Sequence, residues 1–183
     1  MVSKLQLAVQ ECCVKAIRDK EEDAVIGKLL THYYEINEGI GVHKSPSLYG
    51  AFPTDPYSHT PATKGAQQPG MTGQVKEDII SRFGELGVFV LNGQLYFNPA
   101  MLRKNEFLSA PKVFSYINVK GEAIALPLKE KSLCFTYCQV PVIYQLTDQP
   151  GLEIVFSDGS IAKSESLSLD KLTSQKIAQR TGD

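Results

Sequence analysis

Apolar residues in the first forty positions recur at steps of three and four, the spacing that predicts amphipathic helices. A first helix is predicted by the stripe Leu5, Ala8, Val9, Cys12, Cys13 and Ala16. A second helix is predicted by the stripe Val25 or Ile26, Leu29, Tyr33 and Ile36. Gly39 and Gly41 are predicted to end it. A third runs from Thr72 to about Leu86, with the stripe Val75, Ile79, Phe83 and Leu86.

From Val88 onward the apolar period changes to two, which is typical of strands. Val88–Leu91 and Gln94–Phe97 flank Asn92-Gly93, a signal for a type I′ hairpin turn. Further strands are predicted at Val113–Asn118, Ala123–Leu128, Ser132–Val140, Val142–Leu146, Leu152–Phe156 and Ile161–Leu169. With a short helix at Asp170–Arg180, the pattern predicts an α+β chain in which N-terminal helices precede an antiparallel β-sandwich.

The chain therefore divides into a helical segment, residues 1–87, and a sandwich, residues 88–183. Within the helical segment, residues 41–71 form a long polar loop that holds five of the ten prolines and two of the three histidines. A loop of this length in a compact protein is usually functional. We expect the binding residues in its second part, from Tyr49 to Gly73.

Charge and composition exclude several classes. The net charge of -1 predicts no general affinity for nucleic acid or for anionic membranes. The sequence has no apolar run long enough for a membrane span and no signal-peptide pattern, so a cytoplasmic location is expected. Cys134 and Cys138, on one predicted strand, would stand about 13 Å apart, too far for a disulfide. All four cysteines are expected to be buried thiols, and no metal or cofactor is expected.

Two short motifs suggest a family. They are Pro69-Gly70-Met71-Thr72-Gly73-Gln74, at the start of the third helix, and Asn92-Gly93-Gln94-Leu95-Tyr96-Phe97-Asn98-Pro99, in the hairpin. The region from Gly65 to Leu169 resembles the C-terminal end of the α,α-toroid glycoside phosphorylases and hydrolases, in particular the maltose-phosphorylase-like and cellobiose-phosphorylase-like groups. The resemblance implies a partial toroid of helices, followed by a sandwich, in a carbohydrate-active protein. It also implies that the family's general acid lies upstream of the residues present here.

The resemblance also implies roles for particular residues. A Thr-Gly pair at the start of the last toroid helix helps to bind phosphate in the phosphorylases, and Thr72 and Gly73 match it. Free N–H groups at a helix N-terminus favour an anion at the same place. The family's upstream histidine is replaced by Gln67 and Gln68, which suit sugar hydroxyls, and the nearest histidine is His59.

Most of the candidate substrate-binding residues carry polar groups or an aromatic face, the two features that bind sugars, and Gly73 is included through the resemblance. They are Tyr49, Asp55, Tyr57, Ser58, Lys64, Gln67, Gln68, Thr72, Gly73 and Gln74. The candidate catalytic residues are His59, whose reference pKa is about 6.5, and Glu77. A loop that satisfies its own backbone would have the same composition, and the helix dipole alone would account for Glu77.

Two functions follow. The first is a C-terminal segment of a carbohydrate-active enzyme that contributes sugar or phosphate contacts and has little activity alone. The alternative is a non-catalytic binding or assembly module with a polar ligand groove. Helix faces left exposed without a complete toroid would favour self-association into a homo-oligomer.

Overall fold

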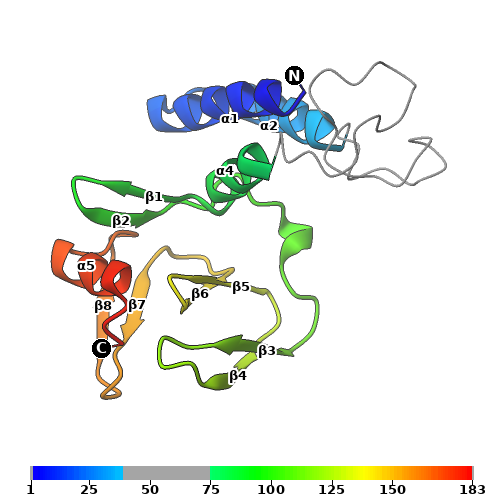
Figure 1. The fold of residues 1–183 in the computed structure, drawn as a ribbon. Helices are drawn as coiled ribbons and strands as arrows, with labels where there is room; N and C mark the ends of the chain where they lie inside the picture. Colours follow the sequence, from blue (N-terminus) through cyan, green and yellow to red (C-terminus); the bar gives the residue numbers. More distant parts are fainter. Residues whose placement is uncertain (1, 39–74, 183) are drawn as a thin grey trace. The chain divides into compact units, whose positions relative to one another are not determined.

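The computed structural model describes residues 2–38 and 75–182 and divides the chain into two compact units, Met1–Leu86 and Gly87–Asp183. In the described ranges the first unit is helical, and the second holds antiparallel strand pairs and a short C-terminal helix (Figure 1). The predicted α+β class, with helices first and antiparallel strands after them, is confirmed.

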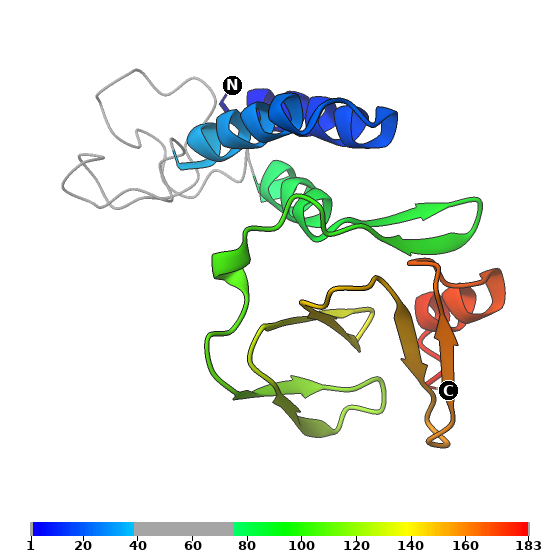
Figure 2. The same cartoon turned by 180° about the vertical axis from the view of Figure 1, so that it is seen from behind.

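The helical unit contains three described helices: α1 (Val2–Asp19), α2 (Asp23–Glu38) and α4 (Val75–Leu86). Helix α1 packs against both α2 and α4, an arrangement visible from both sides of the molecule in Figures 1 and 2. Acidic side chains stand in the first turns of α2 and α4, where they complement the positive end of each helix dipole. Thr72, the expected cap of the third helix, lies outside the described residues.

On α4, and in part on α1, the buried face differs from the expected apolar stripe, whereas on α2 the stripe residue Tyr33 is buried as expected. On α4, Ile79 is 53% exposed and Phe83 41% exposed, whereas Glu77, Ser81 and Glu85 are all below 9%. On α1, the expected stripe is likewise exposed in part, with Leu5 at 54%. Hydrogen bonding between the helices offsets the cost of burying polar groups, and for that reason the apolar period predicts the wrong face here.

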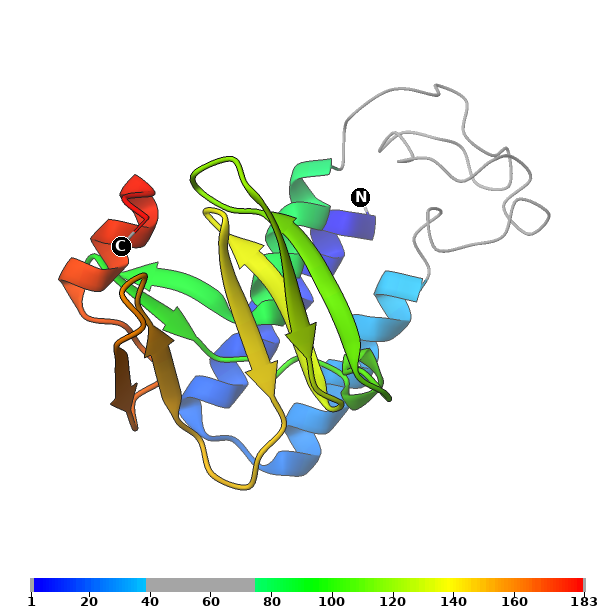
Figure 3. The ribbon, with the colours of Figure 1, turned by 90° about the horizontal axis from the view of Figure 1, so that it is seen from below.

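The second unit is built from four antiparallel hairpins, each a separate two-stranded sheet (Figure 3). The strands are β1 (Val88–Leu91), β2 (Gln94–Phe97), β3 (Lys112–Ile117), β4 (Ala123–Leu128), β5 (Ser132–Tyr137), β6 (Val140–Gln145), β7 (Leu152–Val155) and β8 (Ile161–Ser164). A 3-10 helix, η2 (Lys104–Glu106), precedes β3, and α5 (Lys171–Gln179) follows β8. The Asn92-Gly93 turn joins β1 to β2, and both residues have positive φ, as a type I′ turn requires.

The first hairpin is tied to the C-terminal segment. The backbone N–H of Phe97 donates to the carbonyl oxygen of Leu167, and that of Leu169 donates to the carbonyl of Leu95, each at 2.9 Å. Helix α5 packs on β2, where the hydroxyl of Ser174 accepts from the N–H of Leu95 at 2.9 Å. The buried apolar core of this unit comprises Val88, Leu95, Phe97, Met101, Leu128, Leu133 and Leu169.

The prediction of one strand over Ser132–Val140 is wrong, because a turn at Cys138-Gln139 divides it into β5 and β6. Both turn residues have positive φ, 50° and 65°. Neither cysteine nor glutamine is a residue that signals such a turn, so the pattern of the sequence hides it. Cys138 therefore lies in a turn and not on a strand with Cys134.

The expectation that all four cysteines are buried is also wrong. All four are free thiols, and only Cys13 is buried; Cys12 is exposed, and Cys134 and Cys138 are half-buried. Burial raises the pKa of the thiols of Cys13 and Cys134 above the ordinary value, which disfavours the reactive thiolate at both.

No helix within residues 2–38 and 75–182 combines the length and the apolar character needed to cross a bilayer.

Candidate functional site

Of the residues that the sequence proposes for the site, the structure describes one, Glu77 on α4. It is buried, at 4% exposure. The others lie outside the described residues: Tyr49, Asp55, Tyr57, Ser58, His59, Lys64, Gln67, Gln68, Thr72, Gly73 and Gln74. The candidate site described below therefore consists of Glu77 and the other buried polar side chains of the helical unit.

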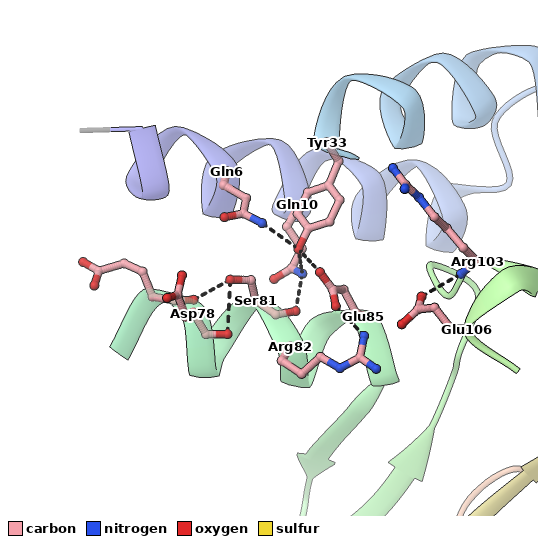
Figure 4. A network of polar contacts seen from close by, with 10 residues as sticks. Gln6, Gln10, Tyr33, Asp78, Ser81, Arg82, Glu85, Arg103 and Glu106 are labelled. Carbon is pink, nitrogen blue, oxygen red and sulfur yellow. Dashed lines mark hydrogen bonds and ion pairs between the residues drawn. The ribbon is translucent and has the colours of Figure 1, made fainter. Parts of the chain in front are cut away.

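Tyr33 lies at the centre of a polar network that joins the three helices of the first unit (Figure 4). Its ring is fully buried, and its hydroxyl donates to Oε1 of Glu85 on α4 at 2.7 Å. The hydroxyl oxygen accepts from the Nε2 atoms of Gln6 and Gln10 on α1, each at 3.2 Å. One donation and two acceptances use the full capacity of a hydroxyl, so the Tyr33 hydroxyl is completely satisfied.

Helices α1 and α4 approach closely where Gln10 meets the backbone of α4. The Gln10 amide donates to the carbonyl oxygen of Ser81 at 2.7 Å. A Cβ atom at Gly84 would collide with the same amide, so the glycine is what lets the side chain lie against the helix. Gln10 therefore fixes the contact between the two helices while it donates to Tyr33.

Glu85 is held from two sides. Its Oε2 pairs with the guanidinium of Arg82 one turn earlier, at 2.6 Å, and its Oε1 accepts from Tyr33. Burial raises the pKa of the Tyr33 phenol well above its usual value, and the adjacent Glu85 carboxylate raises it further. The phenol consequently stays neutral and keeps its proton for donation to Glu85.

Two buried acceptors at this interface have no hydrogen-bond partner. They are Oε1 of Gln6 and Oε2 of Glu77. Gln6 is 1% exposed and Glu77 is 4% exposed. A buried acceptor without a donor is costly, so each of these two atoms lowers the stability of the helical unit.

The sequence contained a signal for this network that the apolar pattern obscured. Gln6 and Gln10 are four residues apart, and so are Glu77, Ser81 and Glu85 in turn. That spacing puts each set on one helix face. Polar stripes of this kind normally face solvent, and the hydrogen bonds to Tyr33 offset the burial of Gln6, Gln10 and Glu85.

Within the described ranges, no three His, Cys, Asp or Glu side chains gather as a metal site would require.

Comparison with known proteins assigns no family. The chain matches no protein-family model, and no curated protein has significant sequence similarity to it.

Proposed function

We propose that this chain is a C-terminal segment of a carbohydrate-active protein of the glycoside hydrolase or phosphorylase kind, and that it contributes ligand contacts from its helical unit. The observation that carries the proposal is the inward polar face shared by α1 and α4. Gln6, Gln10 and Glu85 are buried there around Tyr33, and Glu77 is buried elsewhere on α4.

This proposal assigns binding, and not chemistry, to the chain alone. Glu77 and Glu85 are two turns apart on α4. Glu85 is also occupied by Tyr33 and Arg82. The general acid implied by the family resemblance would come from sequence upstream of these residues, and a cytoplasmic location belongs to the same proposal.

The polar loop supplies the second part of the proposed site. Gln67, Gln68, Thr72 and Gly73 are assigned to it by the family resemblance, as contacts for sugar hydroxyls or for phosphate. Alanine substitution at Gln67, Gln68 and Thr72 together tests that assignment. The proposal expects weaker binding of sugar or phosphate by calorimetry, and unchanged affinity would remove the loop from the site.

Catalysis is tested by assaying the isolated chain for hydrolysis and phosphorolysis of maltose and cellobiose. We expect little or no turnover. Robust turnover would contradict the assignment of binding alone and would require an acid within the chain, for which His59 and Glu77 are the candidates. Alanine at each would then identify it.

A second function, a non-catalytic assembly module, is favoured by one observation. Ile79, Ile80 and Phe83 of α4 are 53%, 53% and 41% exposed, an apolar surface that a second copy of the chain would cover. Light scattering tests this directly. A dimer that Ile80→Lys converts to monomer supports assembly, and a monomer at all concentrations argues against it.

A further inference from the structure

The tip of the first hairpin carries a chemically reactive pair of residues in an open position. Asn92 and Gly93 are both exposed, and a Cβ atom added at Gly93 would meet no atom within 4 Å. Asn92 is the only asparagine in the sequence that precedes a glycine. Because glycine has no side chain, its backbone nitrogen is accessible to the carboxamide of the residue before it. The pair can therefore undergo intramolecular attack of the Gly93 nitrogen on Cγ of Asn92.

Asn118, in the turn after β3, is an asparagine held in place. Its Oδ1 accepts from the backbone N–H groups of Lys120 and Glu122, each at 2.9 Å. Its Nδ2 donates to the carboxylate of Glu122 at 2.8 Å. The next residue, Val119, is β-branched, and its side chain shields its backbone nitrogen. Asn118 is thus an internal reference for an asparagine that resists this reaction.

The folded turn at Asn92-Gly93 opposes the attack. Both residues have positive φ, 51° and 78°, and the register pairs Leu91 with Gln94 across a two-residue loop, as in a type I′ turn. In that turn ψ of the first residue is about +30°, which places the Gly93 nitrogen and the Asn92 Cβ on opposite sides of the Cα–C bond. Ring closure needs both on the same side, so Asn92 reacts only after the turn has opened.

We propose that Asn92 is a site of spontaneous deamidation, and that the β1–β2 turn controls its rate. The Gly93 nitrogen bonds to Cγ of Asn92, the Cγ–Nδ2 bond breaks, and Nδ2 leaves as ammonia with the proton of the Gly93 N–H. Water then opens the resulting succinimide. Cleavage of the bond from the Gly93 nitrogen to Cγ gives aspartate, and cleavage of its bond to the backbone carbonyl carbon gives isoaspartate.

The two products affect the fold differently. Asp-Gly suits a type I′ turn as Asn-Gly does, so the aspartate product retains the hairpin. Isoaspartate adds its Cβ to the main chain, and a two-residue turn cannot take up the extra atom in the same register. Strand β2 holds the C-terminal segment through Leu95, which bonds to Leu169 and to Ser174. The isoaspartate product therefore weakens that attachment.

The experiment incubates the whole chain at mildly alkaline pH, folded in buffer and unfolded in guanidinium chloride, and follows both products by peptide mapping. In the unfolded chain we expect Asn92 to convert well before Asn118. In the folded chain we expect conversion at Asn92 to be about 10-fold slower or more, because about 1.4 kcal/mol of opening free energy reduces the open population tenfold. No conversion at Asn92 in denaturant would overturn the site, and equal rates in both states would overturn control by the turn.

A substitution away from the turn tests the control by a second route. Ser174→Ala removes the acceptor of the Leu95 N–H and loosens β2. We expect the rate at Asn92 to rise about fivefold or more in the folded chain and to stay the same in denaturant. Gln175→Ala, at an exposed neighbour on α5, is the matched control and should change neither rate. An unchanged folded rate in Ser174→Ala would contradict the control by the hairpin.

The effect on the fold is tested with the products themselves. Asn92→Asp reproduces the aspartate product and should keep the melting temperature of the wild type. The isoaspartyl chain, separated by chromatography after incubation, should melt at a lower temperature. An isoaspartyl chain that melts with the wild type would overturn the predicted effect on the C-terminal attachment.

Discussion

The hydroxyl of Tyr33 on α2 donates a 2.7 Å hydrogen bond to the carboxylate of Glu85 on α4, across 52 residues of sequence. The same oxygen accepts from two glutamines of α1. One side chain thus holds all three described helices of the first unit through hydrogen bonds. A buried tyrosine hydroxyl needs such partners, because leaving it unpaired would be costly.

Removing this hydroxyl should destabilise the helical unit. Tyr33→Phe leaves the two glutamine amides and Oε1 of Glu85 without their partner, and we expect a loss of about 1–3 kcal/mol in the free energy of unfolding. Tyr116→Phe, at a half-buried ring on β3, is the control and should cost less. Urea denaturation of both variants is the measurement, and equal losses would contradict the assigned role.

The same tyrosine predicts a loss of stability in alkali. Its pKa in the folded chain is raised from the ordinary value of 10.0, so above about pH 10 the unfolded chain loses a proton that the folded chain retains. The stabilisation is fully present below that pH and is lost as pH rises toward the folded pKa.

Denaturation of wild type and Tyr33→Phe between neutral pH and strong alkali tests this titration. The stability difference between the two should narrow above about pH 10. The pKa of Tyr144 is also raised by burial. Tyr144 therefore lowers the stability of both proteins equally in alkali, and its effect cancels in the difference between them. A difference that stays constant across the range would show that Tyr33 does not carry the pH dependence.

Gly84 and Gly27 should respond oppositely to alanine. Both lie inside helices, where alanine is favoured over glycine by about 1 kcal/mol. At Gly27 nothing stands within 4 Å of the added Cβ, so Gly27→Ala stabilises the chain. At Gly84 the Cβ meets the Gln10 amide, which is held by Tyr33 and Ser81, so Gly84→Ala destabilises it. Thermal melts decide the sign, and stabilisation at both positions would contradict the close contact.

A similar pair exists in the second unit. Gly87 and Gly93 both have positive φ, 65° and 78°, so alanine costs about 1 kcal/mol of backbone strain at either. At Gly87 the added Cβ would also collide with the backbone of Asn98, whereas at Gly93 it meets nothing. We expect Gly87→Ala to lower the melting temperature clearly more than Gly93→Ala, and the reverse order would be inconsistent with this geometry.

Much of the fold could be predicted from the sequence because local signals agreed with it. The Asn92-Gly93 turn, the strand Ala123–Leu128 and the C-terminal helix capped by Asp170, whose Oδ1 accepts from Thr173 at 2.8 Å, all match. The turn at Cys138-Gln139 is not predicted, because its residues carry no turn preference. The pairing of Leu167 and Leu169 with β2 is not predicted either, because it joins segments far apart in the sequence.

The network at the candidate site was harder to predict for a different reason. Polar residues at helical spacing usually form the solvent-exposed face of a helix. The sequence therefore predicts that Gln6, Gln10, Ser81 and Glu85 are exposed. Their burial depends on Tyr33, which comes from a third helix, and no pattern within one helix reports that. Glu77 was proposed from its place after Thr72 and Gly73, and its buried, unpartnered oxygen adds a physical reason to test it.

The measurement that tests the central claim most directly is the melting temperature of the chain with and without maltose, cellobiose and phosphate. A ligand at about 100 times its Kd stabilises the native state by about 2.7 kcal/mol. For a chain of this size that corresponds to a rise of about 5–10 °C. We predict a rise of this order with at least one sugar. A melting temperature unchanged by all three at saturating concentrations would contradict the carbohydrate-binding account.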